Sequence, residues 1–251
     1  MTTLTVLGSA TPYPRPDQPC SGYLLQHEGT KIWVDAGTGT LAELQRHISV
    51  GDLSAIWISH SHADHSADLL TAYYALRFSA LRPSKPVALY CPPGLIERLG
   101  AFLGPKAPAL LPEVFEIHEF DGWGGERVGE LELEWGPMDH GMPAYGLRAT
   151  AGGVSLAYSG DTAPCQGLIE LAEGADLLLA EAGYDTAPSD EPAVHLTPED
   201  AGRAATSARV KRLLLTHIDE TLDPAEAVER AGAEFPGGVF AAKAGDIHTV
   251  G

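Results

Sequence analysis

The sequence has few basic residues: 16 Lys and Arg stand against 34 Asp and Glu in 251 residues, which gives a formal net charge of −18. Proteins that hold many nucleic-acid phosphates gain most of their affinity from Lys and Arg, which displace counterions. Long DNA or RNA is therefore not expected as a ligand, although a local positive site could still bind one phosphate. Bound divalent metals would offset part of this negative charge.

Cysteine is also scarce, and long apolar runs are missing. Cys20, Cys91 and Cys165 are odd in number and far apart, so neither a disulfide framework nor a thiolate metal site is expected. No stretch reaches the roughly 18 apolar residues that span a bilayer. The opening MTTLTVLGSATP lacks the basic and then apolar pattern of a signal peptide. We therefore expect a cytoplasmic protein without membrane contact.

Apolar content, by contrast, is ample. Hydrophobic residues make up 44% of the chain and charged residues 20%, which together predict a folded protein. The proline-rich stretches are short and scattered, and no repeat or charge block divides the sequence. Residues 1–251 are therefore predicted to form one domain.

Short apolar runs bounded by Gly, Pro, Asp or His predict strands, and longer segments predict helices. The predicted strands are Leu4–Leu7, Lys31–Val34, Ala55–Ser59, Val87–Tyr90, Val114–Phe120, Leu131–Trp135, Tyr145–Ala149, Val154–Tyr158, Leu177–Ala180, Arg212–Thr216 and Val239–Ala242. The predicted helices are Leu41–His47, Ala67–Ser79, Gly94–Phe102, Gln166–Glu173, Pro198–Ser207 and Pro224–Glu234. This order predicts an α/β sandwich of two mixed sheets with helices outside.

The segment after the predicted strand at residues 55–59 is rich in metal-binding side chains. It reads HSHADH from residue 60 to residue 65. His60 and His62 face the same side if the chain stays extended, whereas Asp64 and His65 lie where the chain turns toward the next helix. One loop can then serve two ions, and imidazole with carboxylate suits zinc or a similar ion.

Three more candidate ligands each follow a predicted strand. They are His140, Asp161 and His217. Because strand ends of one sandwich can converge on a single cleft, these residues could complete a two-metal site. Taken alone, His140 or His217 would more often be a hydrogen-bonded loop histidine, but the HSHADH motif favours the ligand role.

The chain resembles the metallo-β-lactamase-fold hydrolases over nearly its whole length. It is most similar to the branch that contains tRNA 3′-processing endonucleases and small phosphodiesterases. The similarity rests on LGSATP at residues 7–12, WVDAG at residues 33–37 and the metal-motif positions, which appear in family order. The resemblance implies an αββα sandwich.

The resemblance also implies roles for single residues. A first metal would be held by His60, His62 and His140. A second would be held by Asp64, His65 and His217, and Asp161 would bridge the two. Asp35 would orient a ligand histidine or the HSHADH loop, with a simple turn residue before Gly37 as the alternative.

Two further positions match this branch. Glu181 ends another predicted strand, and His195 precedes the predicted helix at residues 198–207. In phosphodiesterase-like relatives, a glutamate and a histidine at these places form a pair beside the metals. A carboxylate partner raises the pKa of a histidine, which would suit His195 to protonate a leaving alkoxide. Outside the family context, His195 would be an ordinary loop histidine.

The sequence departs from the tRNA-processing enzymes in one respect. Those enzymes carry a long basic arm between the third and fourth metal motifs. Here twenty residues separate His140 from Asp161, and Arg148 is the only basic one. Together with the net charge, this favours a small-molecule substrate. Members of this branch often dimerise, and no feature of the sequence decides whether this chain forms a homodimer.

The predicted function is hydrolysis that depends on two divalent metal ions, with zinc expected and manganese or iron as alternatives. The favoured substrate is a small phosphodiester or a cyclic nucleotide, attacked by a hydroxide that bridges the metals. Catalytic roles are assigned to Asp64, as a partner of the nucleophile, and to His195 with Glu181. A lactone or thioester hydrolase of the same fold is the alternative, and a non-enzymatic metal-binding scaffold is a third interpretation.

Overall fold

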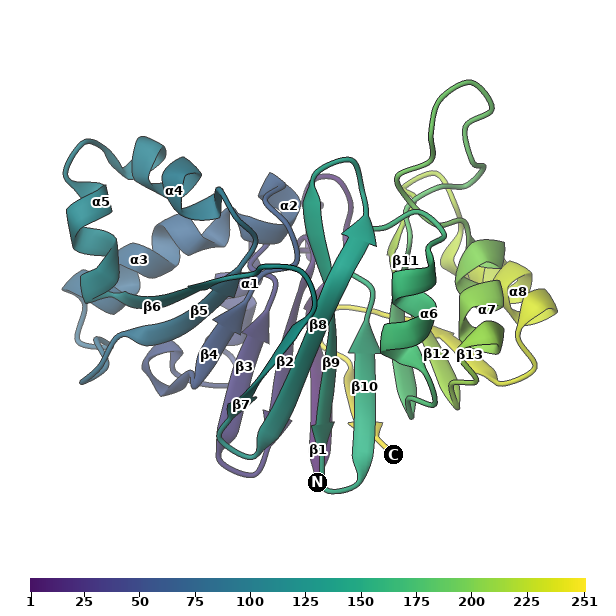
Figure 1. Cartoon of the computed structure of the whole chain (residues 1–251), viewed down its shortest axis with the longest axis horizontal. Coiled ribbons are helices and arrows are strands. Elements are labelled where there is room, and N and C mark those ends of the chain that lie inside the picture. Colours follow the sequence, from purple (N-terminus) through teal and green to yellow (C-terminus); the bar gives the residue numbers. More distant parts are fainter.

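A computed structural model describes all 251 residues and contains two seven-stranded sheets packed against each other (Figure 1). The first sheet has the order β14-β1-β2-β3-β4-β5-β6, and the second has the order β13-β12-β11-β10-β9-β8-β7. Pairing in the first sheet is antiparallel from β14 to β3 and parallel from β3 to β6. The second sheet is antiparallel from β7 to β10 and parallel from β10 to β13. Both sheets are therefore mixed, as predicted.

The elements have the following bounds. The strands are β1 (Thr2–Gly8), β2 (Gly22–His27), β3 (Thr30–Val34), β4 (Ala55–Trp57), β5 (Val87–Cys91), β6 (Phe115–Glu119), β7 (Gly124–Val128), β8 (Leu131–Asp139), β9 (Pro143–Ala151), β10 (Val154–Tyr158), β11 (Leu177–Ala182), β12 (Arg212–Ile218), β13 (Gly238–Ala241) and β14 (Ile247–Val250). The helices are α1 (Thr40–Leu44), α2 (Ala63–Ser66), α3 (Asp68–Phe78), α4 (Leu95–Leu103), α5 (Ala107–Leu110), α6 (Gln166–Ala172), α7 (Pro198–Ser207) and α8 (Pro224–Glu234), with short 3₁₀ turns at Val50–Asp52 and Leu111–Glu113.

Apolar side chains fill three layers. One cluster lies between the sheets, a second lies between the first sheet and helices α1, α3 and α4, and a third lies between the second sheet and helices α6, α7 and α8. Strand β2 shows how the chain serves two layers: Tyr23 and Leu25 face the other sheet, whereas Leu24 faces the helices. This alternation is the period of two that a strand imposes. The predicted αββα sandwich is confirmed.

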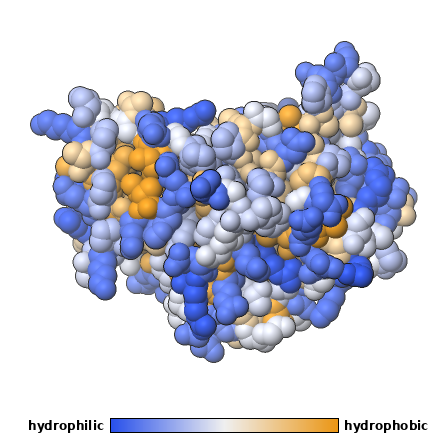
Figure 2. Space-filling view, in the orientation of Figure 1, coloured by the Kyte–Doolittle hydropathy of each residue, from blue (hydrophilic) through white to orange (hydrophobic).

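Every predicted strand and helix has a counterpart in the structure, and α7 and α8 match their predicted bounds. Strands β2, β7 and β14 were not predicted. The helix predicted at Ala67–Ser79 begins one residue later, after the short separate helix α2, and the helix predicted at Leu41–His47 ends at Leu44. None of the helices combines the length and the apolar character needed to cross a bilayer. The surface is mostly hydrophilic, with an apolar patch on the side of α3, α4 and α5 (Figure 2).

The chain carries its candidate ligands to one edge of the sandwich. The HSHADH motif follows β4, His140 follows β8, Asp161 follows β10 and His217 lies near the end of β12. The first of these strands belongs to one sheet and the other three belong to the second sheet. The site is therefore formed only when the two sheets pack together.

Candidate metal centre

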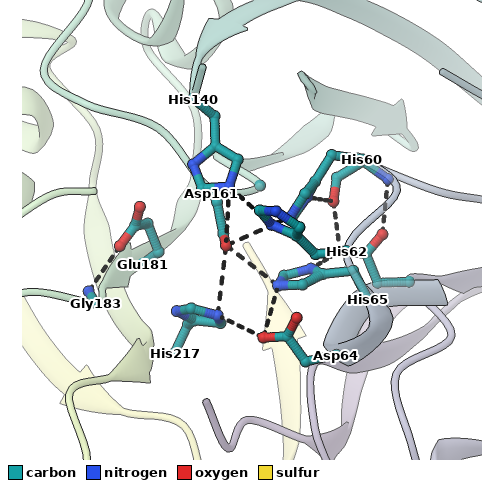
Figure 3. A network of polar contacts seen from close by, with 12 residues as sticks. His60, His62, Asp64, His65, His140, Asp161, Glu181, Gly183 and His217 are labelled. Atoms are coloured by element: carbon teal, nitrogen blue, oxygen red, sulfur yellow. Dashed lines mark hydrogen bonds and ion pairs between the residues drawn. The ribbon is translucent and has the colours of Figure 1, made fainter. Parts of the chain in front are cut away.

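All seven residues predicted as metal ligands meet at this edge (Figure 3). Their ligand atoms fall into overlapping groups in which all atoms lie within 4.8 Å of one another. One group contains His60, His62, His140 and Asp161, and another contains Asp64, His65 and His217. A third group shares Asp161 and His217 with these two and adds His195. Each group has the donor types and the spacing to hold a metal ion.

Three imidazoles surround one position. Nδ1 of His62 lies 3.0 Å from Nε2 of His60 and 3.1 Å from Nε2 of His140. In a tetrahedral zinc site with the usual Zn–N bonds, ligand nitrogens would be about 3.3 Å apart. The three rings are thus spaced like ligands of one ion.

The second group is arranged around two carboxylates. Nε2 of His217 lies 3.2 Å from Oδ2 of Asp64 and 3.4 Å from Oδ2 of Asp161. Nε2 of His65 lies 3.7 Å from Oδ2 of Asp64 and 3.3 Å from Oδ1 of Asp161. Asp161 Oδ2 also lies 3.6 Å from Nε2 of His60. Asp161 therefore faces both groups, as a bridging ligand would.

Hydrogen bonds behind the site fix the orientation of two rings. Nδ1 of His140 donates to the carbonyl of Val194 over 2.7 Å, and Nδ1 of His65 lies 2.7 Å from Oδ2 of Asp35. Because a carbonyl or a carboxylate oxygen only accepts, each Nδ1 carries a proton. In a neutral ring the lone pair is then on Nε2, which faces the centre of the cluster.

The carboxylate of Asp35 accepts several hydrogen bonds behind the site. Its buried carboxylate accepts from the backbone N–H of Ser59 over 2.7 Å at Oδ1. At Oδ2 it accepts from the Ser59 hydroxyl over 2.8 Å and from the Tyr158 hydroxyl over 2.7 Å, in addition to the ring of His65. Asp35 therefore orients a candidate ligand histidine, and it is more than a turn residue.

Two buried atoms show that a cation fits between these side chains. Nε2 of His65 and Oδ1 of Asp161 face each other without a hydrogen-bond partner. Two lone pairs in contact need a proton or a metal ion between them. Burial disfavours the charged ring of His65, but Asp161 and Asp35 outweigh it and raise its pKa well above the ordinary value. A metal ion would take the place of that proton.

The neighbouring histidines are held in the neutral form, which is the form that binds a metal ion. Burial holds the pKa of His60 well below its ordinary value, and the nearby ring of His65 lowers it further. Burial also lowers the pKa values of His62 and His140. Neutral imidazoles beside buried carboxylates are the donor set that zinc and similar divalent ions bind. The residues present therefore fit the metals that the sequence predicted.

Glu181 and His195 form a pair beside this cluster. Oε1 of the fully buried Glu181 accepts from Nδ1 of His195 over 2.9 Å, and its Oε2 accepts from the backbone N–H of Gly183 over 2.7 Å. The ring of His195 lies 4.9 Å from that of His140 and 5.5 Å from that of His217, between ring centroids. Burial lowers the pKa of His195, but Glu181 outweighs burial and raises it to about 9.

Several supporting groups were not found from the sequence. The carbonyl of Val194 is a backbone atom and has no sequence signal. A cavity of about 620 Å³ opens beside His217, and the proline-rich N-terminal loop forms one wall of it with Arg15 and Gln18. The loop therefore borders the cavity beside His217.

Comparison with known proteins agrees with this architecture. Residues 30–218 match the family described as Beta-lactamase superfamily domain. The protein ML1173 of Mycobacterium leprae is 38% identical over 251 residues, in an alignment that covers 98% of this chain and 88% of that protein. Ribonuclease Z of Mycolicibacterium gilvum is 32% identical over 255 residues, with 90% of this chain and 87% of that protein covered.

A solved structure extends the comparison to the whole fold. The metallo-β-lactamase fold protein YhfI from Bacillus subtilis has a TM-score of 0.86 and 26% sequence identity, and the match covers 99% of this chain and 100% of that chain. The family match, the two mixed sheets and the edge cluster of histidines and aspartates agree with one another. The chain belongs to the beta-lactamase superfamily, among the hydrolases with the metallo-β-lactamase fold.

Proposed function

We propose that the protein is a phosphodiesterase that depends on two divalent metal ions, with zinc as the expected metal. The observation that carries this proposal is the Glu181–His195 pair, which stands beside the candidate ligands and gives the site a proton donor. One ion would be held by His60, His62 and His140, the other by Asp64, His65 and His217, with Asp161 between them. When bound, such cations bind ester oxygens and make water acidic enough to attack near neutral pH.

The protein's own side chains would then handle protons. Asp64 is only 11% exposed and keeps one carboxylate oxygen beside His217, so it can accept a hydrogen bond from an attacking water. In the metal-free protein Glu181 raises the pKa of His195, and its carboxylate would favour the charged ring in the same way beside bound metals. A departing alkoxide is a strong base, and a charged imidazole beside it is a suitable general acid. These roles favour esters with poor leaving groups, such as natural phosphodiesters.

The fold supports a small substrate, including a cyclic nucleotide, over a long nucleic acid. Between His140 and Asp161 the chain forms only the hairpin of β9 and β10. The two strands are joined by Gly152 and Gly153, both with positive φ, so no arm extends from this place. The net charge of −18 also opposes binding of many phosphates. One relative is a ribonuclease Z, and ribonucleases cleave phosphodiester bonds, which supports the reaction class.

The test compares wild type with His195→Ala, both loaded with zinc or manganese. Substrates are bis(p-nitrophenyl) phosphate, cyclic nucleotides, lactones and thioesters. General acid catalysis contributes roughly 100-fold or more, so His195→Ala should lose about that factor on cyclic nucleotides and far less on the activated ester. His118→Ala is the matched control, because His118 stacks on Tyr90 away from the cluster.

Two results would contradict the proposal. Full metal occupancy without turnover of any phosphodiester would exclude a phosphodiesterase. Turnover of lactones or thioesters alone would favour the carbonyl hydrolase, which the same metals could support.

A further inference from the structure

The loop that carries His195 makes few hydrogen bonds of its own. It projects from the top right of the molecule in Figure 1 and connects β11 to α7. Residues 186–193 take part in no backbone hydrogen bond, and most of them are exposed. Only its base is closed, where the N–H of Tyr184 donates to the carbonyl of Leu196 over 3.0 Å. The end of this loop nevertheless supplies the carbonyl of Val194 and the ring of His195 to the site.

A single guanidinium joins the two ends of this loop. Arg230 of α8 donates from Nη1 to Oδ1 of Asp185 over 2.5 Å and from Nη2 to the Asp185 carbonyl over 2.6 Å. The same side chain donates to both carboxylate oxygens of Glu199, over 2.8 Å and 3.0 Å. Asp185 lies where the loop begins, and Glu199 lies in the first turn of α7, just after the loop ends.

This arrangement differs from an ordinary surface ion pair. The side chain of Arg230 is 24% exposed and donates four hydrogen bonds from its forked guanidinium. A single exposed ion pair, by contrast, contributes little to stability. The Asp185 end is two residues from Gly183, whose N–H holds Glu181. The Glu199 end belongs to a helix whose start is fixed by a capping box at Thr197.

We propose that Arg230 is a positioning residue that holds His195 against Glu181. It touches no candidate ligand and acts only through the loop. This inference rests on the proposed function, because it assigns to Arg230 the task of keeping the proton donor in place. Proton transfer depends on placement within hydrogen-bond distance, so a loosened loop should slow mainly the reactions that need a proton donor.

The experiment compares Arg230→Met with Arg203→Met. Arg203 of α7 also links this helix to α8, through Glu234 at 3.4 Å, and it pairs with Asp200 of its own helix at 2.7 Å, but it does not contact residues 186–193. Rates are measured at saturating zinc with bis(p-nitrophenyl) phosphate and with diphenyl phosphate, whose phenol leaves poorly because its pKa is about 10. We expect Arg230→Met to lose about tenfold on diphenyl phosphate and less than about threefold on the activated ester. Arg203→Met should stay within about twofold of wild type on both esters.

Two further measurements separate positioning from general damage. Adding Arg230→Met to His195→Ala should not lower the rate of diphenyl phosphate hydrolysis further, because His195→Ala has already removed the proton donor. Arg230→Lys keeps the positive charge but not the forked set of donors, so its rate on diphenyl phosphate should lie between those of wild type and Arg230→Met. This variant takes the place of Arg230→Met if Arg230→Met does not fold. Equal losses on both esters, or a further loss in the double variant, would overturn the inference.

Hydrogen exchange of the Tyr184 amide tests, without any measurement of turnover, whether Arg230 holds the loop in place. This amide closes the base of the loop, so it should exchange faster in Arg230→Met than in Arg203→Met. Unchanged exchange would overturn the inference even if the enzyme is a phosphodiesterase. If wild type cleaves no phosphodiester, the proposed function fails, and the exchange result still decides whether Arg230 holds the loop.

Discussion

Replacing Asp35 by asparagine should weaken metal binding without replacing a candidate metal ligand. Three donors meet Oδ2 of Asp35, from Ser59, Tyr158 and His65. An asparagine can offer only one oxygen, so an amide N–H would face donors that now bond to a carboxylate. With the amide nitrogen at the Oδ2 place, His65 must move its proton from Nδ1 to Nε2 to accept from it, and Nε2 can then no longer bind a metal ion beside Asp161. With the nitrogen at the Oδ1 place, it faces the backbone N–H of Ser59, which pushes the side chain away from its place behind His65.

The structure sets the expected magnitude of Asp35→Asn. Loss of a partner that orients a ligand histidine usually weakens metal binding by roughly 10- to 100-fold. Hydrogen bonds to a charged group contribute about 1.5–3 kcal/mol each, and Ser59 and His65 can partly re-pair. We therefore expect the free energy of unfolding of the metal-free protein to fall by about 2–4 kcal/mol. For a chain of this size, that is a drop of roughly 5–15 °C in Tm.

Zinc titration calorimetry and urea unfolding in EDTA measure the two effects separately. Asp68→Asn is the matched control, because Oδ2 of Asp68 accepts from the N–H groups of Gly39 and Leu41 over 2.9 Å and 2.8 Å and contacts no candidate ligand. That variant should lose stability and keep its zinc affinity. If Asp35→Asn loses stability but binds two zinc ions as tightly as wild type, then Asp35 does not act by fixing the tautomer of His65.

Two more outcomes follow from the Glu181–His195 pair. An alanine at Gly183 would place its Cβ 2.9 Å from Oε2 of Glu181 and 2.9 Å from Nδ1 of His195. Gly183→Ala should therefore slow diphenyl phosphate hydrolysis while the zinc content stays at the wild-type level, and unchanged rates would contradict this expectation. In the metal-free protein the pKa of His195 is raised from its ordinary value to about 9, so the charged ring stabilises the fold below about pH 6.5, and this contribution is lost as the pH rises toward 9. Urea unfolding in EDTA should therefore show wild type losing its advantage over His195→Gln between those pH values, and a constant difference would contradict the assignment.

The candidate ligands could be predicted because each lies just after a strand or near its end. The HSHADH motif is readable by itself, since four donors within six residues are rare. Three ligands could be predicted only from their positions after apolar runs and from their order along the chain; they are His140, Asp161 and His217. Neither feature gives a distance, so the convergence of the seven side chains had to come from the packing of the two sheets.

Other features lie outside what a sequence pattern carries. Strand β14 has only four residues and lies at the edge of its sheet. Strand β7 has the sequence GGERV, and its two glycines and two charged residues are not typical of a strand. Strand β2 was hidden because YLL is a short apolar run between Gly22 and a polar end. The partners of Arg230 stand 45 and 31 residues away in the chain, and no local pattern links residues at such separations.

The same packing that buries the core also sets the geometry of the site. The Tyr158 hydroxyl, from the second sheet, donates over 2.7 Å to Asp35, which directly follows β3 of the first sheet. In the opposite direction, the Tyr23 hydroxyl of the first sheet lies 2.6 Å from Oγ1 of Thr216, the residue before His217. The two tyrosine rings contact each other edge to face, with centroids 5.2 Å apart. A shift of one sheet along the other would break both bonds and separate the ligands, so any core substitution that moves the sheets should weaken metal binding together with stability.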